Sequence, residues 1–173
     1  RKSTRMTHAT AQMDTKDSLF TCNPMELKWI PWAMRGASFK LLSADPATGR
    51  FSLLIKVEKG ITAPVHRHVG AVEGYVLEGG FHYKDAPEIQ FSAGCYLLEK
   101  DGAVHQPVSQ DGAVMFAVFH GAIEGLDGDG KVIGCIDWKW HVDAWDTSIH
   151  ASLTAHNPLP STIRALHASS EAV

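Results

Sequence analysis

Two histidines that stand one residue apart, His66 and His68, have the type and spacing that most directly suggest chemistry in this chain. Side chains two positions apart in a β-strand lie on the same face, so both imidazoles could bind one metal ion. Pro64 just before them indicates that such a strand would be starting here. The chain has ten histidines, so a close pair can also arise by chance. The pair alone leaves two interpretations open: half of a metal site, or two unrelated surface histidines.

The segments that would position these histidines are short, apolar and separated by turn signals. "SFKLLSA" and "RFSLLIKVE" flank "DPATG", which predicts a hairpin. Gly79–Gly80, between "AVEGYVLE" and "FHYKD", predicts a second hairpin, and "DGDG" before "KVIGCIDW" predicts a third. Because turn signals recur between runs of Val, Ile, Leu and Phe, the fold class is expected to be all-β, a sandwich or a barrel. Only the tail after Trp145 could form a helix.

The stretch "GCYLLEKDGAVH", Gly94–His105, adds a third histidine. Its turn at Asp101–Gly102 lies between a strand and this histidine. The resemblance of the two stretches to the two-part signature of the cupin superfamily rests on Gly60, His66, His68, Glu73 and Gly79 in the first part and on Gly94, Gly102 and His105 in the second. The resemblance covers residues 36–145 and implies a single-domain double-stranded β-barrel, or jelly roll, with one metal ion inside. It also implies that the turn brings His105 opposite the first pair. Lys100 and Ser109 depart from the usual signature, but neither change removes a ligand.

The sequence leaves two carboxylates, Glu73 and Asp85, as alternatives for the fourth ligand. Counting strand parity through a turn at Gly79–Gly80 places Glu73 on the inner face, with Asp85 across the hairpin from it. Each could reach the ion, but Glu73 could instead orient a histidine, and Asp85 could be an ordinary loop residue. Burying two unpaired carboxylates would be costly, so we expect only one of them to bind the ion.

Two longer stretches, "HRHVGAVEGYVLEGGFHYKD" and "GLDGDGKVIGCIDW", are similar to the 2,4'-dihydroxyacetophenone dioxygenase group. That ChrR-like group is similar to acetylacetone-cleaving cupins and to the cupin domain of some zinc-binding anti-sigma factors. The resemblance implies a non-haem Fe(II) enzyme that uses O₂ to cleave a C–C bond beside a carbonyl. It implies that His66, His68 and His105 hold the ion, and it favours Asp85 slightly over Glu73. Zn, Ni or Mn are alternatives for the divalent ion, because imidazole ligands suit all of them.

A hydroxyketone or β-diketone substrate could chelate such an ion through two oxygens, and chelation would polarise its carbonyl. The barrel would then need an apolar pocket. The aromatic and apolar residues expected to line it are Tyr75, Leu77, Phe81, Tyr83, Met115 and Phe119. Two other functions stay open: a non-catalytic zinc sensor or regulatory cupin, and a different cupin enzyme. Residues 1–24 are short for an anti-sigma segment and lack its Cys/His cluster, which counts against the sensor.

Composition excludes several other classes of function. The formal net charge is −3 without a long Lys/Arg block, so nucleic acid and acidic lipid are not expected partners. No apolar run approaches the roughly 20 residues that span a bilayer. The N-terminal stretch lacks the apolar centre of a secretory signal. Three widely spaced cysteines form no disulfide framework, and a cytoplasmic location is expected.

The chain of 173 residues is expected to hold one domain. We predict a flexible N-terminal arm over residues 1–24, the cupin barrel over 25–146, and a partly helical C-terminal tail over 147–173. The expected partners are a small carbonyl substrate, O₂ and a second copy of the chain in a homodimer. The homodimer rests on analogy with the fold, whose exposed strand edges need to be covered.

Overall fold

Residues 22–152 are described by the computed structural model of the chain, and they form an all-β fold with one helix. The 3₁₀ turn η1 (Pro24–Glu26) precedes the strands. In chain order the strands are β1 (Ile30–Pro31), β2 (Ala37–Asp45), β3 (Arg50–Val57), β4 (Ile61–Thr62), β5 (His66–His68), β6 (Val72–Tyr83), β7 (Ala86–Ser92), β8 (Tyr96–Glu99), β9 (Val104–His105), β10 (Pro107–Ser109), β11 (Ala113–Phe119), β12 (Ile123–Leu126) and β13 (Val132–Ile136). The helix α2 (Trp138–Ser152) follows them.

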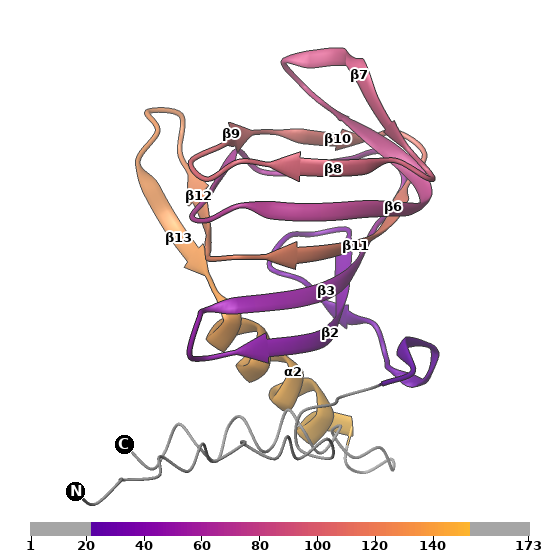
Figure 1. The fold of residues 1–173 in the computed structure, drawn as a ribbon, viewed down its shortest axis with the longest axis vertical. Coiled ribbons are helices and arrows are strands. Elements are labelled where there is room, and N and C mark those ends of the chain that lie inside the picture. Colours follow the sequence, from indigo (N-terminus) through magenta and orange to yellow (C-terminus); the bar gives the residue numbers. More distant parts are fainter. Residues whose placement is uncertain (1–21, 153–173) are drawn as a thin grey trace, which may run out of the picture.

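The strands form two sheets, which Figure 1 shows as a curled, barrel-like arrangement. The larger sheet has the order β1-β2-β3-β11-β6-β10-β4, with β7 and β8 also paired to β6. The smaller sheet has the order β13-β12-β5-β9. Neighbours such as β3 and β11 are far apart in sequence, as expected for a jelly roll rather than a meander. The predicted all-β jelly-roll class is confirmed.

Two of the three predicted hairpins are present, and the third differs. The β2–β3 pair turns at residues 46–49, and β12–β13 turns at the Asp-Gly repeat. Gly79 and Gly80, however, lie inside the continuous strand β6, which turns into β7 only after Tyr83. Gly79 has φ +63°, and a Cβ on it would collide with the carbonyl oxygen of Gly112. These two glycines therefore allow backbones to approach closely instead of forming a turn.

The core lies against the inner face of β2 and β3, where α2 closes one end of the barrel (Figure 1). Phe39, Phe51 and Leu53 are fully buried, and each such side chain contributes about 1.5–3 kcal/mol. Trp145 of α2 packs into the same cluster. The helix begins at Trp138 and not after Trp145 as predicted, because the Asp137 carboxylate accepts a hydrogen bond from the Trp140 N–H and caps the first turn.

The segment before β2 covers one edge and one face of the larger sheet. β1 pairs with β2, placing Ile30 opposite Phe39. Lys40 is 6% exposed, and its ammonium donates to the Pro24 carbonyl and lies over the Trp29 ring. The division into arm, barrel and tail stays a prediction, because most of the arm and residues 153–173 fall outside the described range. Within residues 22–152, no helix is long and apolar enough to cross a membrane.

Candidate metal centre

Three histidines come together on two neighbouring strands of the smaller sheet. His66 and His68 lie on β5 with one residue between them, as the sequence predicts, and His105 on β9 is the strand partner of His66. The turn at Gly102 makes this pairing possible: the Gly102 N–H donates to the His68 carbonyl, and the His68 N–H donates to the Ala103 carbonyl. His105 therefore lies opposite the first histidine pair, as expected from the sequence.

The side chains of these three residues converge on one point. The His105 Nε2 lies 3.0 Å from the His68 Nε2 and 3.0 Å from the His66 Nε2. All three donor atoms fit within 4.8 Å of one another. Two nitrogens that bind one ion at about 2.0–2.1 Å lie roughly 2.8–3.4 Å apart for right-angled to tetrahedral coordination. The spacing therefore fits a shared metal ion.

The protonation of the rings fits a metal ion as well. The His66 Nδ1 lies 2.9 Å from the Pro64 carbonyl, which can only accept, so Nδ1 carries the proton and Nε2 turns a lone pair toward the centre. A backbone carbonyl on the outer ring nitrogen is the usual way to orient a histidine ligand. Burial lowers the pKa of His66, and it lowers the pKa of His105 to about 4. Both rings are therefore neutral near neutral pH, the state that binds metals.

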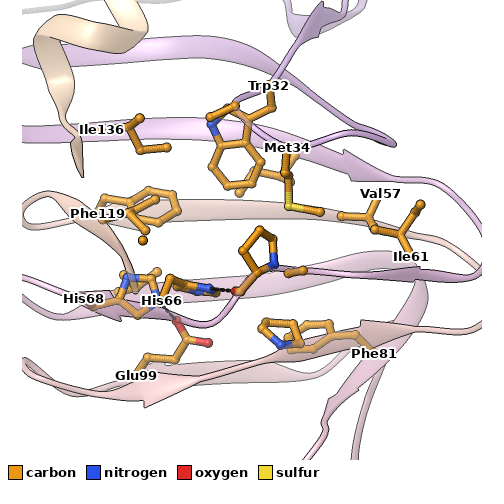
Figure 2. A pocket seen from close by; sticks show the side chains of 18 of the residues that line it. Trp32, Met34, Val57, Ile61, His66, His68, Phe81, Glu99, Phe119 and Ile136 are labelled. Atoms are coloured by element: carbon orange, nitrogen blue, oxygen red, sulfur yellow. Dashed lines mark hydrogen bonds and ion pairs between the residues drawn. The ribbon is translucent and has the colours of Figure 1, made fainter. Parts of the chain in front are cut away.

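A carboxylate that sequence reasoning missed, Glu99, lies beside the histidines (Figure 2). Its Oε2 is 2.9 Å from the His68 Nε2, and its Oε1 is 3.6 Å from the His105 Nε2. The Tyr83 hydroxyl donates to Oε1, and the Tyr83 ring stacks on His105 with 4.6 Å between centroids. Burial and the charge of Glu99 raise the Tyr83 pKa, so this hydroxyl keeps the proton that it donates.

The carboxyl of Glu99 stays ionised despite its burial. Burial alone would raise its pKa, but the hydrogen bond from His68, the charges of His105 and His68, and the hydrogen bond from Tyr83 together hold the pKa below its usual range. The site therefore combines three converging imidazoles with one adjacent negative charge.

Glu73 lies on the outer face of the sheet, away from the three histidines. Its carboxylate accepts from the Tyr96 hydroxyl at 3.0 Å and lies 3.2 Å from the His120 Nε2. The cause is a β-bulge in β6: Met115 of β11 pairs with Val76 and Val114 pairs with Glu78, which leaves Leu77 as an extra residue. One extra residue reverses which side chains face inward.

Asp85 is not brought to the site either. It lies in the exposed turn between β6 and β7. Within the described residues, the group of side chains that could hold a metal ion consists of the three histidines only. The alternation of Tyr96–Glu99, in which Leu97 is buried and Tyr96 and Leu98 are exposed, places Glu99 on the inner face with Leu97. The sequence signal that could have identified Glu99 was its position in a strand, two residues after Leu97 and on the same face.

A cavity of about 370 Å³ opens from the histidines into the space between the two sheets. It is lined by His66, His68 and Glu99 at one end and is otherwise almost entirely apolar. Of the predicted pocket residues, Phe81, Met115 and Phe119 line it. Tyr83 contacts Glu99 and His105 without lining the cavity, and Tyr75 and Leu77 lie exposed on the outer face because of the same bulge.

The fold and this constellation agree with the comparison to known families. Residues 17–124 match the ChrR cupin-like domain family, so the chain belongs to that family of cupins. The match spans all three histidines and Glu99.

Individual relatives give the same fold and one activity. The acetylacetone-cleaving enzyme of Acinetobacter johnsonii is 26% identical over 117 residues, which cover 64% of this chain and 74% of the enzyme. The structure of an acetylacetone dioxygenase from the same organism superposes with a TM-score of 0.65 at 20% identity, over 85% of this chain and 99% of that one. An RmlC-like cupin protein from Ralstonia eutropha gives a TM-score of 0.72 at 24% identity, over 84% of this chain and 95% of that one.

Proposed function

We propose that this chain is a metal-dependent dioxygenase that cleaves a C–C bond next to a carbonyl in a β-diketone or hydroxyketone. The observation that carries the proposal is the convergence of three imidazoles, two of which, His66 and His68, line one end of an apolar cavity. The likeness to an enzyme whose name states that it cleaves acetylacetone supports the choice of reaction. In this proposal His66, His68 and His105 hold one divalent ion, Fe(II).

Bound there, Fe(II) would polarise the carbonyl oxygens of a chelating substrate and provide a redox-active centre for O₂. The protein supplies the rest. Glu99 places a fixed negative charge beside the ligand set, and Tyr83 holds that carboxylate in position. In this proposal Glu99 is the carboxylate beside the metal ion, a role for which the sequence suggested Glu73 or Asp85. The walls from Met115 and Phe119 exclude water from the reacting atoms.

The test is an oxygen-uptake measurement on the full chain, purified without added metal and then loaded anaerobically with Fe(II). Acetylacetone and hydroxyacetophenones are the substrates, and elemental analysis gives the metal content before loading. Uptake that depends on substrate and is lost in His105→Ala is the expected result. Full occupancy by zinc with no uptake after iron loading would overturn the proposal and favour a regulatory metal-binding role.

The remaining expectations stay predictions. A homodimer and a cytoplasmic location accompany the proposed function, and size-exclusion chromatography with light scattering checks the first of them.

A further inference from the structure

The cavity is larger than its metal-binding end requires. Its volume of about 370 Å³ equals that of about a dozen liquid water molecules and lies in the range of ligand pockets. Figure 2 shows His66, His68 and Glu99 gathered at one end and Val57, Ile61 and Phe81 at the other. A small diketone held by the histidines would leave the far end unfilled.

The far end selects for an uncharged, apolar group. Among the described residues, no Lys, Arg or Asp lines the cavity. The Ser109 hydroxyl does line it, but its one proton is already donated to the Gly80 carbonyl. A charged or strongly polar group placed here would lose its hydration without gaining a partner.

Trp32 also lines the cavity, on the side away from Glu99 (Figure 2), and its ring is fixed from behind. The Trp32 indole N–H donates to the Nε2 of the fully buried His141 at 2.9 Å, and the His141 Nδ1–H donates to the Asp137 carbonyl at 2.6 Å. The His141 ring stacks on Phe51 in the core.

The loop that follows Trp32 is fixed as well. The Trp32 N–H donates to the Ala37 carbonyl at 3.0 Å, and Gly36 packs directly against the Ile61 side chain, which would have to shift to admit a Cβ. Because a hydrogen bond and packing hold it on both sides, the indole is a rigid boundary and not an adaptable one.

We propose that Trp32 is the specificity-determining residue of the site: it sets how long an apolar arm the substrate carries on its carbonyl. This inference rests on the proposed function, since it assumes that the histidines bind the chelating end of a diketone. It predicts an aryl-sized arm as the best fit, with methyl too small and a fused two-ring arm too long.

Ligand binding tests the inference without turnover. The full chain is loaded with Zn(II), which has no redox chemistry, and titrated calorimetrically with acetylacetone, 1-phenylbutane-1,3-dione and its 2-naphthyl analogue. The phenyl ligand should bind wild-type protein about tenfold more tightly than acetylacetone, and the naphthyl ligand less tightly than the phenyl. In Trp32→Ala the ratio of naphthyl to phenyl affinity should rise about tenfold, because the wall is removed.

Two further variants secure the result. Trp29→Ala is the matched control: this half-buried tryptophan packs over Lys40, away from the cavity, so its ligand ratios should equal those of wild type. Val57→Phe fills the far end from the opposite strand and should lower the affinity for the phenyl ligand about tenfold relative to acetylacetone. It therefore tests whether the ligand arm occupies this cavity even where Trp32→Ala fails to fold.

The outcomes separate the two proposals. Ligand ratios that are unchanged in folded Trp32→Ala, or in Val57→Phe where Trp32→Ala does not fold, would overturn the role of Trp32. If the ratios shift as expected but the Fe(II) form consumes no oxygen, the proposed function fails and the boundary stands. If no diketone binds at all, both are wrong.

Discussion

His141 and the three converging histidines are all buried or half-buried near the same cavity, yet their ring nitrogens have opposite surroundings. His141 is fully buried, against 3% exposure for the His68 side chain and 10% for His105. Both of its ring nitrogens have protein partners, the Trp32 indole and the Asp137 carbonyl. In the converging group, the three Nε2 atoms face one another and the Glu99 carboxylate instead of separate partners in the protein.

Burial therefore does not distinguish a structural histidine from a metal ligand in this molecule. The pKa of His141 and that of His105 are both lowered to about 4, in each case first by burial. The difference is where the lone pairs point. In a structural histidine, both ring nitrogens form hydrogen bonds to other groups of the protein. When the nitrogen lone pairs of several histidines point at one place, a cation is needed to bind them.

The largest expected effect is on metal affinity, when one of the converging histidines is removed. His105→Ala should weaken metal binding about a thousandfold or more, because only two ligands would remain. Metal content after dialysis and the dissociation constant from a chelator competition are the measurements. His141→Gln is the comparison and should retain the ion. Equal metal loss in the two variants would erase the distinction between the two kinds of histidine.

The next effect concerns acid stability and acts through His141. Its folded-state pKa is about 4, whereas an unfolded histidine titrates near 6.5. Above pH 6.5 the ring is neutral in both states, so no stability is lost. As the pH falls from 6.5 to 4, only the unfolded chain takes up the proton, and the free energy of unfolding should decrease by up to about 3 kcal/mol before levelling off.

Urea unfolding of wild-type and His141→Gln protein across this pH range measures that loss. The glutamine does not titrate, so the difference between the two curves isolates His141 from the other histidines. Parallel curves would mean that His141 does not contribute to the acid sensitivity.

A smaller effect on metal affinity is expected from the inner carboxylate, Glu99, and none from the outer one, Glu73. Glu99→Gln keeps the shape of the side chain but removes its charge beside the histidines, and it should weaken metal binding about 10- to 100-fold. Glu73→Gln alters a carboxylate of the outer face, which contacts Tyr96 and His120, and should leave metal affinity unchanged. If Glu73→Gln had the greater effect on metal affinity, the placement of the two faces of β6 would be wrong.

The sequence predicts the parts of the site that depend on local geometry. The i, i+2 spacing in β5 and the glycine turn before β9 are enough to bring three histidines together. The carboxylate could not be placed in the same way, because the bulge at Leu77 is set by the pairing of β6 with β11 and not by its own residues. Parity counted through Gly79 therefore assigned the wrong face to every residue before the bulge, Tyr75 among them.

The boundary of the cavity was also beyond the reach of sequence patterns. Trp32 and His141 are 109 positions apart and become partners only through the packing of α2 against β2. Neither residue belongs to a motif. The side of the cavity formed by Trp32 is thus set by tertiary structure. The histidines at the metal-binding end, in contrast, can be predicted from two short stretches of sequence.

The smallest predicted effect tests whether that long-range bond matters to folding. Trp32→Phe keeps an aromatic ring but removes the N–H, which leaves the buried His141 Nε2 without its partner and should cost about 1–2 kcal/mol. In the His141→Phe background the same change should cost less, because no buried acceptor is left unpaired. Urea unfolding of the four proteins in this cycle at pH 7.5, where His141 is neutral, gives the coupling energy. A coupling near zero would mean that packing alone holds Trp32, and that the structural histidine, unlike the converging three, could be replaced by any side chain of its shape.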